Sequence, residues 1–257
     1  MNTQETKCSN QNKDWSKLKK KSSMYEEVLA RAPVSEEVTA LSFADWFFRT
    51  RRVVSFLNPV NYEMLRRSFG DISGIDHVFF DGIFAARWIG KLSGNAYKRL
   101  SFDFTSVAPP FFEYCSKHGK KLYIVGAKDT ELSAFVSLLE ASYKKSQIVG
   151  RQHGYINIDQ ITELSKNIEQ AGSDVVLCGM GCPKQEQFSV ELSKLLPNVS
   201  FITCGGFIHQ TQNKLQYYPS WVDKTNLRSV YRFYKEPHTR KRLKFYPKFV
   251  WATLKKF

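Results

Sequence analysis

A carboxylate and two amides are the residues of this sequence whose types and positions most directly suggest chemistry. Asp81 follows the apolar stretch 78–80 and precedes Gly82. A carboxylate at the end of a buried strand can act as a general base, or it can cap the helix that follows; the local sequence leaves both open. Asn58 and Gln185 also stand where an expected strand or turn ends, and an uncharged amide can both donate and accept hydrogen bonds there.

Positive charge is concentrated near the C-terminus. Residues 214–257 contain twelve Lys and Arg against Asp223 and Glu236, a net charge of +10 out of +14 for the chain, and eleven aromatic residues lie among them. This mixture suits an anionic lipid surface, single-stranded nucleic acid, or a basic tail that packs some of its rings on the main domain. Pro237 and Pro247 exclude one long helix, so we expect short helical segments.

The elements that must position these residues are short apolar segments that alternate with helical patterns. This alternation is typical of a parallel sheet covered by helices. The expected strands are residues 53–57, 78–80, 122–125, 148–149, 175–178 and 201–204. The sequence therefore predicts an α/β fold, a Rossmann-like and mostly parallel sheet flanked by helices, with a basic, aromatic-rich C-terminal helical appendage.

Two turns of this expected sheet are candidate ligand sites. Gly126 and Gly179 each follow a strand and precede a helix. Such turns form the ligand crevice of open α/β sheets, where helix N-termini favour phosphate. The clearest helix begins near Asp129, and a second is expected to open at Pro183. The chain has neither a G-x-G-x-x-G string nor a P-loop.

Length and composition bound the organisation of the chain. Its 257 residues, 42% of them hydrophobic, suffice for one large domain with an appendage. We expect a polar flexible arm at residues 1–25, a catalytic α/β domain at 26–210 and the appendage at 211–257. The five cysteines are scattered, which predicts a reducing cytoplasm, no disulfide framework and no structural metal. No apolar run approaches the roughly 20 residues that span a bilayer, so any membrane contact is expected to be peripheral.

Four segments together resemble a known family. They are residues 53–59 (VVSFLNP), 79–83 (FFDGI) with 98–103 (KRLSFD), 179–186 (GMGCPKQE), and 205–237, which ends in YRFYKEP. In order and spacing they resemble the WecG/TagA/CpsF family of bacterial glycosyltransferases, glycosyltransferase family 26, over about residues 45–245. The G-x-G-x-P-K-Q-E and Y-R-x-x-x-E-P strings are the most specific of these motifs.

The resemblance implies an inverting, metal-independent transfer of a hexose or N-acetylhexosamine. The donor would be a UDP-sugar, and the acceptor an undecaprenyl-pyrophosphate-linked saccharide at the cytoplasmic face of the membrane. No Asp-x-Asp pair is present to hold a metal on the diphosphate, so cations are expected in that role. The implied roles are as follows: Asp81 is the catalytic base, Arg232 and then Arg240 bind the diphosphate, and Asn58, Arg99 and Gln185 line the substrate pocket. The implied partners are the two substrates and the anionic inner membrane surface, without nucleic acid or cofactor, and a homo-oligomer is possible.

The sequence departs from the family pattern at several positions near this expected pocket. Phe84 stands where the family often has a glycine, Phe56 replaces a threonine, and Ile208 and His209 replace a Phe-Asp pair. These changes leave the donor open between UDP-N-acetylmannosamine, the family's best-known donor, and UDP-glucose or another UDP-hexose. The alternative function is an RNA-binding α/β protein whose basic tail follows phosphate, although no aromatic RNP string accompanies it.

Overall fold

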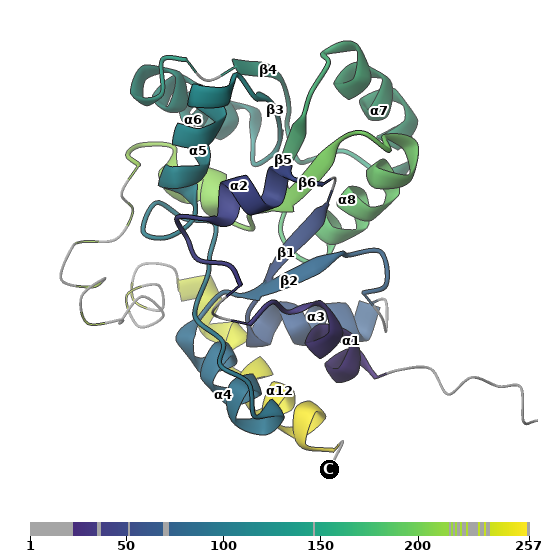
Figure 1. Ribbon diagram of the computed structural model, residues 1–257, viewed down its shortest axis with the longest axis vertical. Helices are drawn as coiled ribbons and strands as arrows, with labels where there is room; N and C mark the ends of the chain where they lie inside the picture. The colour runs from purple at the N-terminus through teal and green to yellow at the C-terminus, as the bar shows by residue number, and fades with distance from the viewer. Residues whose placement is uncertain are drawn as a thin grey trace, which may run out of the picture.

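The centre of the protein is a six-stranded sheet in which all strands run parallel (Figure 1). The computed structural model describes residues 23–34, 37–50, 52–68, 72–145, 147–215 and 237–255, with residues 217, 219, 222, 225, 231 and 234. The strands are β1 (Val53–Leu57), β2 (His77–Phe80), β3 (Lys121–Gly126), β4 (Gln147–Gln152), β5 (Val175–Gly179) and β6 (Ser200–Thr203). Their order across the sheet is β2-β1-β6-β5-β3-β4. All six expected strands and the α/β class are confirmed.

Helices pack on both faces of this sheet (Figure 1). The α-helices are α1 (Met24–Arg31), α2 (Phe43–Phe48), α3 (Pro59–Ser68), α4 (Ile83–Ser93), α5 (Ala108–His118), α6 (Asp129–Ser142), α7 (Ile161–Gln170), α8 (Lys184–Leu195), α9 (Phe207–Thr211) and α12 (Phe245–Leu254). Two 3₁₀ turns, η2 (Ile158–Gln160) and η3 (Pro237–Arg242), complete the described elements. Helices α1, α3, α4, α7, α8 and α12 contribute to one hydrophobic cluster, and α2, α5, α6 and α9 to the other.

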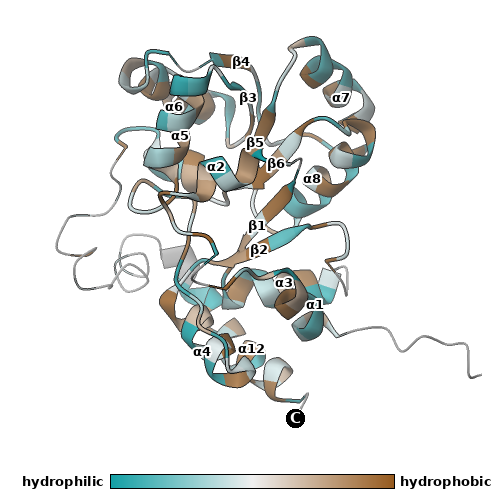
Figure 2. Cartoon of the chain, in the orientation of Figure 1, coloured by the Kyte–Doolittle hydropathy of each residue, from teal (hydrophilic) through white to brown (hydrophobic). Residues whose placement is uncertain are grey.

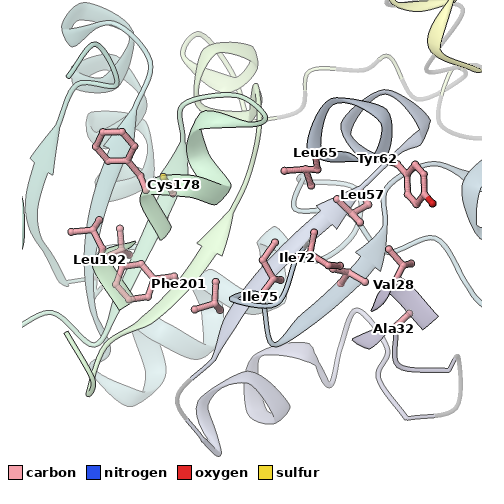
Figure 3. Packing of buried hydrophobic residues seen from close by; sticks show 14 of the residues in the cluster. Val28, Ala32, Leu57, Tyr62, Leu65, Ile72, Ile75, Cys178, Leu192 and Phe201 are labelled. Atoms are coloured by element: carbon pink, nitrogen blue, oxygen red, sulfur yellow. The ribbon is translucent and has the colours of Figure 1, made fainter. Parts of the chain in front are cut away.

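Side chains along a strand alternate between the two faces of the sheet, so one strand contributes to both hydrophobic clusters. In β1, Val53 and Leu57 belong to the first cluster, whereas Val54 and Phe56 belong to the second. Strands β1 and β5 are buried at every position, as strands covered on both faces must be. Figure 2 shows the central strands largely in the brown of apolar residues, and Figure 3 shows Leu57 among the packed side chains of the first cluster. The one polar residue of β1 is Ser55, which is buried and belongs to the site described below.

The expected helix starts are confirmed. Helix α6 begins at Asp129, and its apolar stripe, which includes Leu132 and Phe135, is buried against the sheet. Helix α8 begins at Lys184, directly after Pro183. Both helices therefore start at the carboxyl end of a strand, which points their free backbone N–H groups toward that edge of the sheet.

The C-terminal segment returns to the main domain. Phe249 of α12 is buried, and the centre of its ring lies 5.0 Å from the centre of the Tyr62 ring in α3. Trp88 of α4 donates a 2.9 Å hydrogen bond from Nε1 to Oγ1 of Thr253. Short helical segments are found here as expected, and Pro247 lies in the first turn of α12, where its missing N–H costs no hydrogen bond. The boundary between the catalytic domain and the appendage at residues 210 and 211 stays a prediction.

The predicted N-terminal arm lies almost entirely outside the described residues. Its last two residues, Met24 and Tyr25, already belong to α1 and are buried. Helix α1 begins there because Ser23 caps it: its Oγ accepts from the Glu26 amide, and the Glu26 carboxylate accepts from the Ser23 amide. No helix in the described part of the chain is long and apolar enough to cross a bilayer.

Candidate active site

A cavity of about 880 Å³ opens at the carboxyl ends of the strands. Its wall is built from the segments that follow all six of them. The lining includes Asn58 after β1, Asp81 after β2, Ala127 after β3, Gly154 after β4, Gln185 after β5 and Gly205 after β6. In a parallel sheet these turns all lie at one edge, and ligands bind in the crevice outside them. The sheet thus gathers residues from six separate parts of the sequence around one space.

The crevice lies where the chain changes direction across the sheet, between β3 and β5. The connection from β3 leads outward to β4, whereas the connection from β5 leads inward to β6. Gly126 pairs with Gly179 at this point, and a Cβ on Gly126 would lie 2.4 Å from the Gly179 carbonyl oxygen. Gly126 also has φ of +154°, so glycine alone satisfies both the conformation and the close approach. Ala127 and Gly179 line the cavity, as the sequence predicted for these two turns.

The Asp81 carboxylate lies in the cavity wall and does not cap the following helix. The N-cap residue of α4 is Gly82, with φ of +116°, and α4 receives no side-chain cap. The Asp81 backbone is held by a 2.9 Å hydrogen bond from its N–H to the Leu57 carbonyl. Its side chain is 35% exposed and lies beside Arg99, with 3.7 Å between Asp81 Oδ1 and Arg99 Nη2. Of the two roles left open by the sequence, the structure excludes the cap.

Arg99 joins the two carboxylates of this part of the wall. Besides Asp81, its Nη2 forms a short ion pair with Asp103 Oδ2. The Arg99 and Asp103 side chains are only 18% and 19% exposed, so water screens this pair less than it screens a surface ion pair. Asp103 is fixed in turn by hydrogen bonds from Ser101 Oγ at 2.6 Å and the Thr105 amide at 2.9 Å. Asp103 therefore closes the turn before α5 and orients the guanidinium.

The two amides predicted to line the pocket do so, but each also serves the fold. Asn58 Oδ1 accepts 3.0 Å hydrogen bonds from the Val60 and Asn61 amides, so only its Nδ2 group can serve a ligand without breaking that cap. Gln185 is 1% exposed, and its Oε1 accepts a 2.9 Å hydrogen bond from the Gly205 amide. Gln185 thus ties the turn after β6 to the first turn of α8.

Beneath this turn lies a buried carboxyl group, Glu186, to which the sequence analysis gave no role. Its Oε1 accepts from Gln185 Nε2 at 2.8 Å and from Ser55 Oγ at 3.0 Å, while Ser55 Oγ accepts from Thr203 Oγ1 at 2.9 Å. Its Oε2 is buried without a hydrogen-bond partner among the described residues. Burial raises the pKa of Glu186 above its ordinary value, which favours the neutral acid. The signal available in the sequence was the Gln-Glu pair itself, together with a serine in an otherwise apolar strand.

On the side of β3, the cavity is lined by a second polar pair that the sequence did not predict. His209 Nδ1 lies 2.9 Å from Glu131 Oε1, although the two residues are 78 positions apart. The other oxygen, Oε2, accepts a 3.1 Å hydrogen bond from the Lys128 amide. Burial acts to raise the pKa of Glu131, but these hydrogen bonds outweigh it and the net pKa lies below its ordinary value. His209 was noted in the sequence only as a departure from the family pattern.

Neither arginine that was predicted to bind phosphate is among the described residues that line the cavity. Arg232 lies outside the described part of the chain. Arg240 is exposed on η3 and is not among the described residues that line the cavity, whereas Arg242, two positions on, lines it. The basic run was visible in the sequence, but which of its members faces the cavity depends on how η3 meets the sheet edge. The described residues contain no group of three or more His, Cys, Asp or Glu side chains arranged to hold a metal ion.

With the parallel sheet and this cavity established, comparison with known proteins defines the class of the protein. Residues 31–257 match the WecG/TagA/CpsF glycosyl transferase family, and the chain belongs to that family. The family expected from the motifs is therefore confirmed, and the protein is a glycosyltransferase. The RNA-binding alternative finds no support in these comparisons.

Two relatives describe the chemistry found in this family. A Shigella boydii protein named UDP-Gal:alpha-D-GlcNAc-diphosphoundecaprenol beta-1,4-galactosyltransferase is 32% identical over 206 residues, which cover 79% of this chain and 85% of the relative. A Bacillus subtilis (strain 168) protein named N-acetylglucosaminyldiphosphoundecaprenol N-acetyl-beta-D-mannosaminyltransferase is 27% identical over 206 residues, 79% of each chain. Both names specify an acceptor in which a sugar is joined through a diphosphate to undecaprenol.

Proposed function

We propose that the protein transfers a hexose or N-acetylhexosamine from a UDP-sugar to N-acetylglucosaminyl-diphosphoundecaprenol, without a metal and with inversion, in bacterial surface polysaccharide synthesis. The observation that carries this proposal is the Asp81 carboxylate, which stands in the cavity wall beside Arg99 and does not cap a helix. The acceptor follows the names of both relatives, and UDP-galactose is the first donor to test because the 32% identical relative uses it.

The proposed reaction needs one base and one set of cations. Asp81 accepts the proton of an acceptor hydroxyl as its oxygen attacks the anomeric carbon of the donor from the face opposite the UDP. The bond from that carbon to the β-phosphate oxygen breaks, and UDP leaves with the bonding electrons. Positive charge near the diphosphate stabilises the departing group. Arg232 and Arg240 remain the proposed cations for this role, and Arg242 joins them because it lines the cavity.

Arg99 supports a mechanism without a metal. Its guanidinium lies beside Asp81 and pairs with Asp103, so positive charge is already present between the two carboxylates. An arginine there keeps a fixed charge at every physiological pH. In this proposal Arg99 holds the Asp81 side chain in place, while the arginines of the C-terminal segment bind the diphosphate.

The C-terminal helix is the proposed contact with the inner face of the plasma membrane. Trp251 and Leu254 of α12 are 57% and 45% exposed. Lys255 places Nζ 3.6 Å from the centre of the Trp251 ring, and Lys244 and Lys248 lie near Phe245. Exposed rings beside lysines suit an anionic bilayer surface, at about 1 kcal/mol for each basic residue near the lipid. In this proposal the cavity lies beside the surface that carries the lipid-linked acceptor.

The deciding experiment is a transfer assay with purified protein, a short-chain GlcNAc-diphospho-lipid and a panel of UDP-sugars. UDP-galactose, UDP-glucose, UDP-N-acetylglucosamine and UDP-N-acetylmannosamine are each supplied alone, and UDP release and the product mass are measured. We expect one donor to give acceptor-dependent UDP release and a product longer by one sugar. UDP release that does not depend on the acceptor, or no transfer from any UDP-sugar, would reject the proposed function.

A further inference from the structure

We propose that Phe84 is the floor of a binding site for the acceptor saccharide, a pyranose ring that stacks on the exposed face of the aromatic side chain. The proposal rests on the proposed transferase function. It adds a recognition element that none of the family motifs contains and that is separate from the base and the cations.

The first observation is the position of Phe84. It lies in the first turn of α4, three residues after Asp81, and lines the same cavity. Its side chain is 41% exposed, although it belongs to a large apolar residue type that is normally buried. Exposed aromatic surface inside a cavity that also contains carboxylate, guanidinium and amide groups is unusual for a structural role, and it supplies the apolar part of a ligand site.

The second observation is that the Phe84 ring is held rigidly on its other sides. It stacks on Trp88, one helical turn further along α4, at 6.2 Å with an interplanar angle of 9°. Tyr246 and Phe249 of α12 approach it at 5.6 and 6.3 Å. Trp88 is itself fixed by its hydrogen bond to the buried Thr253. The exposed part of the ring therefore belongs to a packed aromatic group. Binding of a ligand there would immobilise little additional side chain, which lowers the entropic cost of binding.

The chemistry of the site fits a sugar ring. A pyranose has one face of C–H groups and an edge of hydroxyls, and the electron-rich face of an aromatic ring attracts such C–H groups. Around Phe84, the hydroxyl edge would meet Asp81, Arg99 and the Nδ2 group of Asn58, all of which line the cavity. A lipid tail would use the ring but has no hydroxyl groups to bind the polar side chains around it.

The geometry of the sheet assigns this ring to the acceptor and not to the donor. The crevice that suits the nucleotide lies between β3 and β5, whereas Phe84 follows the edge strand β2, three strand spacings from β5. At about 4.8 Å per spacing this separation is roughly 14 Å. The base acts on the acceptor hydroxyl and must lie within about 3 Å of it. During transfer both sugars lie near Asp81, because the hydroxyl that it deprotonates attacks the donor. The donor sugar reaches Asp81 from the crevice between β3 and β5, so we assign the opposite side, toward α4 and α12, to the acceptor. Helix α12 is also the proposed lipid-facing element.

The test compares Phe84→Ala, Phe84→Leu and Phe84→Trp in the transfer assay with a short-chain acceptor. Phe84→Leu keeps apolar bulk without a ring, and Phe84→Trp keeps a ring. We expect Ala and Leu to raise the acceptor KM about tenfold while the UDP-sugar KM stays unchanged, and we expect Trp to stay within about twofold of the wild type. The matched control is Leu195→Ala. It removes a 48% exposed apolar side chain at the C-terminal end of α8, opposite to the end that lines the cavity. Melting temperatures verify that each variant is folded.

Three results would overturn the subsite. The acceptor KM could stay unchanged in Ala and Leu variants that are folded, or the donor KM could rise equally. The third is an effect that appears only with the full-length lipid, which would show that the ring contacts the tail. All three require a wild-type protein that transfers sugar, so they are distinguishable from failure of the proposed function, in which the wild type transfers nothing and the subsite is rejected with it.

Discussion

Arg99 and Asp103 form an ion pair four residues apart in sequence, and the same guanidinium lies 3.7 Å from Asp81. A backbone bridge reinforces this arrangement, because Arg99 pairs with Phe80 at the end of β2 and the Leu100 amide donates a 3.1 Å hydrogen bond to the Phe80 carbonyl. The segment that carries Arg99 thus extends the edge of the sheet. The position of the proposed base and the position of its cation are set by one local structure.

Replacing Asp81 with Asn should remove the base and keep the shape of the site. We expect kcat to fall by about 10²–10⁴, the usual contribution of a positioned base, with little change in the melting temperature. Initial rates and thermal denaturation measure the two effects. Asp159→Asn, at an exposed carboxylate on η2, is the control and should keep full activity. An Asp81→Asn protein that retains more than a tenth of the wild-type kcat would contradict the assignment.

Replacing Arg99 with Lys tests whether the planar guanidinium is needed. Arg99 approaches both Asp103 and Asp81 through Nη2. The ammonium of a lysine is more strongly hydrated and sits on a flexible stem without a planar group to fix it, so kcat/KM should fall about tenfold or more. Arg49→Lys is a matched control, because Arg49 forms a similar pair with Asp45 four residues away, exposed on α2. Equal activity of both variants would show that Arg99 contributes only a charge.

The buried Glu186 makes a prediction about stability against pH. Its folded pKa is raised, so its contribution to stability is fully present below the unfolded pKa of about 4.3 and is lost as the pH rises toward the folded value. Glu186→Gln resembles the neutral acid and lacks this loss. We expect the free energy of unfolding of the variant, relative to the wild type, to increase from pH 5 to pH 8 in urea titrations. A difference that stays constant with pH, or decreases, would mean that Glu186 is ionised in the folded protein.

The exposed face of α12 should control membrane binding separately from chemistry. We expect Trp251→Ala with Leu254→Ala to reduce flotation with vesicles that contain anionic lipid, and we expect added salt to weaken binding of the wild type. Activity on a short-chain soluble acceptor should stay within about twofold of the wild type. Equal flotation of both proteins would remove α12 as the membrane contact.

Metal independence is tested by chelation. With arginines in place of a divalent ion, the initial rate in excess EDTA should equal the rate without it, and added Mg²⁺ or Mn²⁺ should not raise it. A rate that collapses in EDTA and returns with one metal would reject the proposed role of the arginines.

The fold was largely predictable because its signals are local. Each strand is a short apolar segment bounded by turn residues, and the start of α6 is marked at Asp129, so the elements could be placed to within a few residues. The candidate site was predictable in part. Asp81, Asn58, Arg99 and Gln185 do line the cavity, because residues that follow parallel strands meet at one edge.

The rest of the site depends on contacts between distant parts of the chain. The pair of Glu131 and His209 exists because β6 and β3 bring their following turns together, and Glu186 becomes a buried acid only because Ser55 of β1 and Gln185 surround it. No short stretch of sequence predicts either contact. Both depend on the strand order β2-β1-β6-β5-β3-β4, which no single segment determines.

By itself, the sequence determined the α/β class, the strands, the family and the identity of the candidate base, because apolar periodicity and motif spacing are properties of neighbouring residues. Only the tertiary structure decided that Asp81 faces a cavity and does not cap α4, that the Gln185 amide is held by Gly205, and that Arg242 lines the cavity while Arg240 does not. The physical reason is that a side chain's partners are fixed by which elements pack together, and packing joins residues that are far apart in the chain.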